Sequence, residues 1–248
     1  MFQSQTDNEI ERLFAASPNI SDKVYNSKQV EGLPTPVKRY FQYSLQEDQP
    51  YISYVRLKHK GQFRQKQKWQ AIKGQEYFTV EKPGFIWIGK VPFFKAKDKY
   101  YDGQGNLQIK LFSFIPIINT KGKEWNQGEL LRWLGEAPWF PTALLPSEKL
   151  RWEPIDEESA KVILSDKNLT VEGTFYFNNL GQATQFKAKR YKDGSLEDWT
   201  GFYSDYRMVN GIRVPFYVEV VWNLDSGDFS YAKFTVDLIE YDIPMKFD

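Results

Sequence analysis

The chain has 248 residues, enough to bury most of one large hydrophobic core without covalent crosslinks. It contains no cysteine, which excludes disulfides and thiolate chemistry. Its 33 Lys and Arg residues balance 32 Asp and Glu residues, which argues against a nucleic-acid binder because that class usually has a basic excess. Aromatic residues make up 17% of the chain, with 8 Trp, and large rings favour both half-buried strands and apolar pockets.

The first residues indicate where the protein resides. Residues 1–7 lack the basic and apolar regions of a signal peptide. The longest apolar stretch, residues 111–118, is far shorter than the ~20 residues of a membrane-spanning helix. We therefore expect a soluble, cytoplasmic protein with no transmembrane segment.

Two helices are predicted before the first strand. Ile10, Leu13 and Phe14 recur at helical spacing within residues 6–16, and Pro18 follows. A second helix is expected from Thr35 as N-cap, with Pro36 at the first helical position. We assign residues 1–32 to an N-terminal helical extension and residues 33–248 to a single β-rich domain.

From residue 51 the apolar period changes to two, which is typical of half-buried antiparallel strands. Turn signals such as Asn210-Gly211 separate successive segments. Roughly ten strands in hairpin succession are expected, from segments at residues 51–64, 76–80, 85–88, 97–101, 107–112, 151–154, 160–164, 169–177, 184–191, 203–209, 212–214, 216–224 and 229–239. The pattern predicts a mainly β (α+β) fold, an antiparallel meander that forms an open or partly closed barrel.

A helical insertion at about residues 126–145 interrupts the strands. Its helix, residues 128–136, ends before Pro138. Glu129, Arg132, Trp133 and Glu136 lie at spacings that place them on one helix face. That face is expected to be an ion-paired surface, with Arg132 between the two carboxylates, or the wall of a cavity, and both interpretations can hold together.

Three blocks of the chain carry a family resemblance: LPTPVKRYF at residues 33–41, PGFIW at 83–87 and GELLRWLGEAPWFPTALL at 128–145. They resemble a bacterial family of unknown function over about residues 33–240, so the resemblance implies no activity. At the level of fold, strands that curl around a helix resemble LolA/LolB-type lipoprotein-carrier half-barrels, which hold acyl chains in an apolar cavity.

Signatures of catalysis and cofactor binding are missing. His59 is the single histidine, and no Gly-x-Ser-x-Gly elbow presents a serine nucleophile. One histidine without cysteine makes a zinc site improbable. The 102–105 segment, DGQG, has two glycines only and predicts a turn instead of a dinucleotide loop. We predict no catalytic residue, metal or cofactor.

The leading functional prediction is non-catalytic binding or carrying of a lipophilic small molecule in an aromatic-lined cavity. The expected ligand-binding residues are four Trp, four Arg and the two helix carboxylates: Trp87, Trp133, Trp139, Trp199, Arg39, Arg64, Arg132, Arg190, Glu129 and Glu136.

Two alternatives stay open. One is a carbohydrate-active or other hydrolase with a carboxylate pair. Glu129 and Glu136 would be about 10 Å apart along a helix, near the upper limit for an inverting pair, and Asp98 or Glu153 are possible nearer partners. The other is a scaffold or interaction protein, which would display its aromatic residues on an exposed patch.

Overall fold

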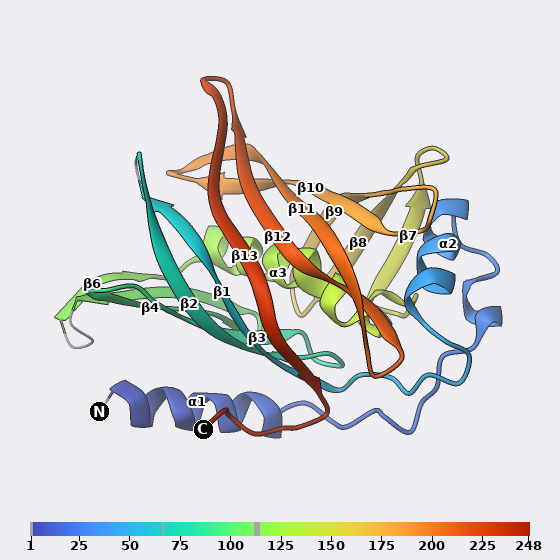
Figure 1. Ribbon diagram of the computed structural model, residues 1–248, viewed down its shortest axis with the longest axis horizontal. Coiled ribbons are helices and arrows are strands. Elements are labelled where there is room, and N and C mark those ends of the chain that lie inside the picture. Colours follow the sequence, from blue (N-terminus) through green and yellow to red (C-terminus); the bar gives the residue numbers. More distant parts are fainter. Residues whose placement is uncertain (1, 66, 112–114) are drawn as a thin grey trace.

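The computed structural model describes residues 2–65, 67–111 and 115–248. Within them, thirteen strands form one antiparallel sheet that curls around a central helix (Figure 1). The two outermost strands, β6 and β7, do not pair with each other in the described structure, so the sheet forms an open half-barrel. The predicted mainly β, open-barrel fold is confirmed.

The sheet consists of two meanders. The first contains β1 (Tyr54–Gln65), β2 (Lys68–Thr79), β3 (Gly84–Lys90), β4 (Phe94–Tyr101), β5 (Gln104–Leu111) and β6 (Ile115–Thr120). The second contains β7 (Leu150–Pro154), β8 (Ser159–Asp166), β9 (Leu169–Phe177), β10 (Ala183–Lys192), β11 (Ser195–Val209), β12 (Ile212–Leu224) and β13 (Gly227–Tyr241). The first and last strands, β1 and β13, pair and join the two halves.

The helices are α1 (Phe2–Ala15), α2 (Thr35–Ser44) and α3 (Lys123–Glu136), with short 3₁₀ turns at Ser27–Val30, Ala137–Trp139 and Pro141–Leu144. Helix α3 connects the two edge strands and lies in the hollow of the sheet (Figure 1). The N-cap of α2 is Pro34, one residue earlier than predicted, and makes no side-chain capping bond. Within the described residues, no helix is long and apolar enough to span a membrane.

The strand register follows the predicted alternation. In β1, Val55, Leu57 and His59 are buried, whereas the lysines between and after them are more exposed. The predicted hairpin at Asn210-Gly211 joins β11 and β12 with positive φ angles of 50° and 83°, which suits a type I′ turn. These local signals determine which row of side chains in each strand faces the hollow.

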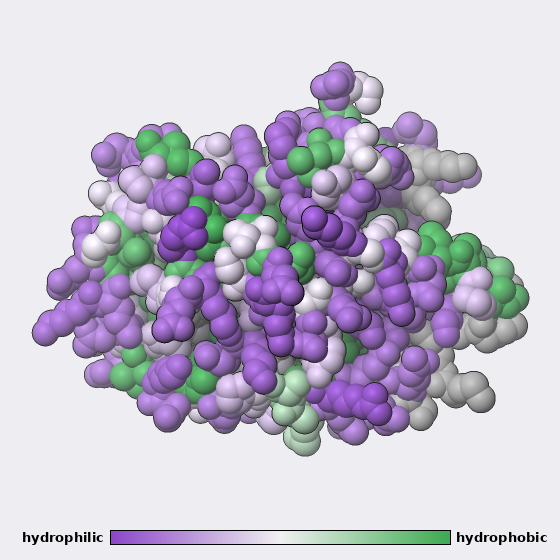
Figure 2. Space-filling model, turned by 180° about the vertical axis from the view of Figure 1, so that it is seen from behind, coloured by the Kyte–Doolittle hydropathy of each residue, from purple (hydrophilic) through white to green (hydrophobic). Residues whose placement is uncertain are grey.

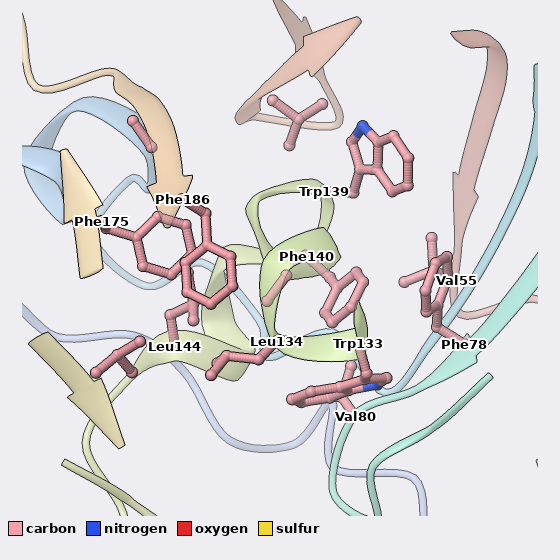
Figure 3. Packing of buried hydrophobic residues seen from close by; sticks show 14 of the residues in the cluster. Val55, Phe78, Val80, Trp133, Leu134, Trp139, Phe140, Leu144, Phe175 and Phe186 are labelled. Atoms are coloured by element: carbon pink, nitrogen blue, oxygen red, sulfur yellow. The ribbon is translucent and has the colours of Figure 1, made fainter. Parts of the chain in front are cut away.

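The main core fills one part of the hollow, between α3, the 3₁₀ turns and the sheet (Figure 3). Leu130, Leu131 and Leu134 of α3 are fully buried there. Trp133 packs against Phe140 with ring centroids 5.4 Å apart, and its indole N–H donates to the Thr79 carbonyl. Trp133 is thus a core residue.

Helix α1 covers the opposite, outer face of the sheet. Its Ile10, Leu13 and Phe14 form a second small cluster with outward-facing side chains of β1, β2 and β3 and with Phe247. Because this cluster packs outside the half-barrel, it leaves the hollow free.

Two strand predictions were wrong in detail. β6 was not predicted, because its residues 115–118 are apolar without alternation and include Pro116. β12 runs unbroken through Pro215, where a break was expected. Pro215 lies before Tyr217, the first residue of β12 that pairs with β13, so its missing N–H costs no bond on that side. The predicted end of the 107–112 strand, Phe112, lies outside the described residues.

Candidate functional site

A cavity of about 700 Å³ occupies the rest of the hollow, within the range typical of small-molecule sites. Its wall is formed by α3 and by inward residues of both meanders. Apolar side chains dominate this wall, among them Ile72, Trp87, Phe94, Leu107, Ile109, Trp125, Trp139, Trp199, Val218, Val220, Trp222, Tyr231 and Phe234.

The mouth of the cavity is marked by residues that both line it and are exposed to solvent. Phe63, Ile117, Ile118 and Tyr191 meet both conditions, and so do Glu124, Asp193 and Gly194. In the view from behind, most of the surface is hydrophilic, and apolar area gathers at the end of the molecule where β5 and β6 lie (Figure 2). The mouth is therefore framed by apolar and aromatic side chains together with two carboxylates.

Three indoles of the wall donate their N–H groups to acceptors of the protein. The Trp87 N–H donates to His59 Nε2 at 2.7 Å, the Trp139 N–H to the Pro215 carbonyl at 2.9 Å, and the Trp199 N–H to the Tyr231 hydroxyl at 3.0 Å. Since a buried indole N–H needs a partner, these bonds leave the ring surfaces available for apolar contact.

His59 acts as an acceptor in this wall. It is buried, and burial together with the positive charge of Arg132 lowers its pKa to about 3. The imidazole is therefore neutral at physiological pH and can accept the Trp87 N–H. This arrangement gives His59 a structural role.

Carboxylates interrupt the apolar rows of the sheet at the deep end of the cavity. Glu76 of β2 is 1% exposed and lies opposite Trp87 of β3, which in turn lies opposite Asp98 of β4. One inward row across three strands thus reads Glu, Trp, Asp. Helix α3 supplies two more carboxylates, Glu129 and Glu136.

Arg132 holds three of these carboxylates. Its Nη2 donates to Glu76 at 2.7 Å, its Nη1 to Asp98 at 2.8 Å and its Nε to Glu136 at 2.9 Å. The guanidinium also lies 4.8 Å from the ring centroid of Phe85 and 5.3 Å from that of Trp87. Bonds from one guanidinium to β2, β4 and α3 fix the helix against the first meander.

Arg190 of β10 holds the remaining carboxylate. Its Nη2 donates to Glu129 Oε1 at 2.8 Å, and its guanidinium lies 5.5 Å from the Trp199 ring centroid. The predicted bridge from Arg132 to both helix carboxylates was therefore wrong in part: Arg132 pairs with Glu136, and Glu129 pairs across to the second meander.

The cluster has four carboxylates and two guanidiniums, so burial forces some carboxyl groups to keep their protons. Burial, followed by the nearby charge of Asp98, raises the pKa of Glu129 to about 8. Burial and the charge of Glu136 raise the pKa of Glu76 well above its usual value. A pKa of about 8 keeps Glu129 protonated at pH 7, and burial raises the pKa of Glu136 as well.

Three oxygens of the cluster lack a hydrogen-bond donor within the described structure. They are Asp98 Oδ1, Glu129 Oε2 and Glu136 Oε2, and each is buried. Protons held between neighbouring carboxyl groups serve some of these oxygens, since Glu129 interacts with Asp98 and Glu76 with Glu136. These oxygens are thus acceptors that depend on shared protons.

Eight of the ten predicted ligand-binding residues line the cavity: Arg64, Trp87, Glu129, Arg132, Glu136, Trp139, Arg190 and Trp199. Two do not. Trp133 is in the core, and Arg39 of α2 donates to the Glu157 carbonyl at 2.7 Å, away from the cavity wall. Trp133 lies at the border between the two faces of α3. Helical spacing alone therefore does not show whether Trp133 faces the core or the cavity.

The sequence reasoning missed Glu76 and several rings, including Trp125 and Trp222. A signal for Glu76 was present, since it alternates with Ile72, Gly74 and Phe78 on the inward face of β2. Of the possible hydrolase partners, Asp98 joins the cluster, whereas Glu153 is on β7 and pairs with Arg151. Among the described residues, no group of His, Cys, Asp and Glu is arranged to hold a metal ion.

Fold and site together define a class: an open antiparallel half-barrel with a central helix, an apolar cavity and a buried ionic cluster. The chain belongs to DUF6544, a family of unknown function whose sequence pattern matches residues 23–234.

Comparison with solved structures gives low sequence identities. A LolA superfamily protein from Nitrosomonas europaea is 12% identical over 83% of this chain and 91% of that chain, with a TM-score of 0.44. A DUF1329 family protein from Desulfovibrio piger is 8% identical over 97% of this chain and 95% of that chain, with a TM-score of 0.47. A search of curated proteins found no match.

Proposed function

We propose that this protein binds a lipophilic small molecule in the cavity and carries it without chemical change. The observation that supports the proposal is the cavity itself, about 700 Å³ in volume and walled mainly by rings and aliphatic side chains. A cavity of this size with an apolar wall and a few convergent polar groups is the usual form of a small-molecule site.

The distribution of the tryptophans also favours binding over a scaffold role. All eight lie in the described part of the chain, and none of them is exposed. Five of them line the cavity: Trp87, Trp125, Trp139, Trp199 and Trp222. A scaffold would instead present such rings on an open patch. The cytoplasmic location predicted from the sequence stays a prediction.

The test is ligand capture by a variant with a filled cavity. Native mass spectrometry of gently purified protein is expected to show a bound apolar molecule. Ile109→Trp places a large ring in the cavity wall and is expected to abolish this adduct. Gln108→Trp is the matched control, because Gln108 is the neighbouring residue of β5 and does not line the cavity. Equal capture of the adduct by both variants, or no adduct in any, contradicts the proposal.

A hydrolase is the second candidate, favoured by the protonated state of Glu129 beside Asp98. A carboxylic acid that stays neutral at pH 7 next to a carboxylate is the arrangement of a general acid. Against this, Arg132 donates to Asp98 and Glu136 and so occupies an oxygen of each that a general base would need. A glycosidase and esterase screen separates the candidates: turnover that Glu129→Gln abolishes would establish the hydrolase.

A further inference from the structure

The ionic cluster of the cavity wall indicates the head group of the ligand. We propose that the cavity selects amphiphiles whose head group donates hydrogen bonds and carries no negative charge, with a primary ammonium as the best match. This inference rests on the proposed function and adds the chemical class of the ligand to it.

The first argument is the balance of charge. At the deep end of the cavity four carboxyl groups face two guanidiniums: Arg132 faces three of them, and Arg190 faces Glu129. Arg64, the residue after Phe63, is the third guanidinium of the wall and donates to Gln67 Oε1 instead. At the deep end a fatty acid or a phosphate head group would therefore find carboxyl groups in excess of guanidiniums. It would also lie against carboxylate oxygens in a buried setting, where repulsion between like charges is strong.

The second argument is the excess of acceptors. Oxygens of Asp98, Glu129 and Glu136 are buried without a donor in the described structure, and the Glu129 side chain is fully buried. Buried acceptors are nearly always satisfied by protein, water or ligand. Protons shared between Glu129 and Asp98 and between Glu76 and Glu136 meet this need, and the N–H groups of an ammonium, or the O–H of an alcohol, can meet it in their place.

The third argument is the surrounding aromatic wall. Trp87 and Trp199 each lie near a guanidinium of the cluster, at 5.3 Å and 5.5 Å from ring centroid to Arg Cζ. Indole faces attract cations, so the deep end of the cavity already holds positive groups against rings. An ammonium group can use the same kind of surface while its alkyl chain extends along the apolar wall.

Binding of an ammonium has a measurable consequence for protons. Glu129 keeps its proton at pH 7 because burial raises its pKa to about 8. An ammonium placed beside it stabilises the ionised form, so the proton leaves the cluster when the ligand binds. A neutral alcohol satisfies the acceptors without this release.

The test compares three amphiphiles with the same chain, namely dodecylamine, dodecanol and dodecanoic acid, by isothermal titration calorimetry at pH 7. We expect the amine and the alcohol to bind at least about tenfold more tightly than the acid. Dodecanoate binding as tight as that of the amine overturns the head-group inference alone. No binding by any of the three contradicts the proposed function as well.

Two variants change the charge balance in opposite directions. Glu129→Gln cannot ionise beside a bound ammonium and is expected to reduce the preference for amine over acid by about tenfold. Arg190→Gln removes the guanidinium that faces Glu129 and is expected to increase that preference. Asp198→Asn and Lys189→Gln are the matched controls, because this exposed ion pair lies outside the cavity wall.

Proton release distinguishes ligand recognition from a merely structural effect. Titrations of dodecylamine in two buffers of different ionisation enthalpy report the protons released on binding. We expect release with the wild-type protein and a reduced release with Glu129→Gln. The inference is overturned if both folded cavity variants keep the head-group preference of the wild type and the wild type releases no proton on binding.

Discussion

At the residue scale, the unusual feature is a network of ionisable side chains inside an apolar hollow. Removal of four carboxylates from water is costly, and a buried pair offsets this cost only when its geometry satisfies the remaining polar atoms. Arg132 meets three carboxylates at 2.7–2.9 Å, and raised pKa values keep protons on Glu76 and Glu129. The network is thus tolerated by pairing and by protonation together.

This protonation predicts how stability depends on pH. The folded-state pKa of Glu129 is about 8, above its unfolded value of 4.5. The folded state therefore binds the proton more tightly, and the contribution of Glu129 to stability is present below pH 4.5 and is lost as pH rises toward 8. The loss is at most about 1.4 kcal/mol per pH unit.

Urea denaturation at several pH values between 5 and 8 measures this effect. Glu129→Gln imitates the protonated carboxyl group, so the variant should gain stability relative to the wild type as pH rises. Glu172→Gln, at an exposed carboxylate of β9, is the control and should show no such trend. If the free energies of unfolding of Glu129→Gln and the wild type differ by the same amount at every pH, the raised pKa of Glu129 is contradicted.

The sequence predicts that the helix residues of this network lie together, but not which sheet residues join them. Glu129, Arg132 and Glu136 share a helix face, so local spacing brings them together. Glu76 and Asp98 are brought to Arg132 only by the register of β2, β3 and β4. Register depends on pairing between distant segments, so a single sequence does not reveal which carboxylates will meet.

At the element scale, α3 is held close to β5 by a glycine. A Cβ atom at Gly105 would lie 2.3 Å from the Trp125 carbonyl oxygen and 2.9 Å from Glu129 Cγ. The Gly105 N–H also donates to Asn126 Oδ1 at 2.9 Å. Residue 105 therefore has no room for a side chain while the helix stays in place.

Gly105→Ala is expected to push α3 away from the sheet and to lower the free energy of unfolding by about 1–3 kcal/mol. The emission of Trp125, which lies at this contact, should change as well. Urea denaturation followed by fluorescence measures both. Gly32→Ala is the matched control, since a Cβ atom there meets no atom within 4 Å. Equal stability of the two variants would show that α3 is not held by this contact.

The elements themselves differ in how well the sequence predicts them. Strands with one buried face, such as β1 and β9, show clear alternation and were found from it. β6 is an exposed edge strand with no buried face to impose alternation, so the pattern misses it. α3 begins five residues earlier than predicted because Gly122 caps it without a side-chain bond.

At the scale of the whole molecule, the order of strands explains why the hollow contains both a core and a cavity. Two meanders diverge from the β1–β13 pair, and α3 crosses between their far edges. Ala137–Trp139 and Pro141–Leu144 continue from α3 and help fill one part of the hollow with core residues. The curvature of the sheet and the crossing of α3 arise only when the whole sheet is assembled. For this reason composition predicted an aromatic-lined cavity but not its position or its depth.

Because both meanders and α3 supply its wall, an occupied cavity should stabilise the whole fold. A ligand that binds only the folded state adds RT ln(1 + [L]/Kd), which is about 2.7 kcal/mol at a hundredfold excess over Kd. We expect a ligand identified by calorimetry to raise the thermal midpoint of the wild type in proportion to the logarithm of its concentration. Ile109→Trp should show no such rise, whereas Gln108→Trp should respond like the wild type. An equal rise in all three proteins would place the ligand outside the cavity.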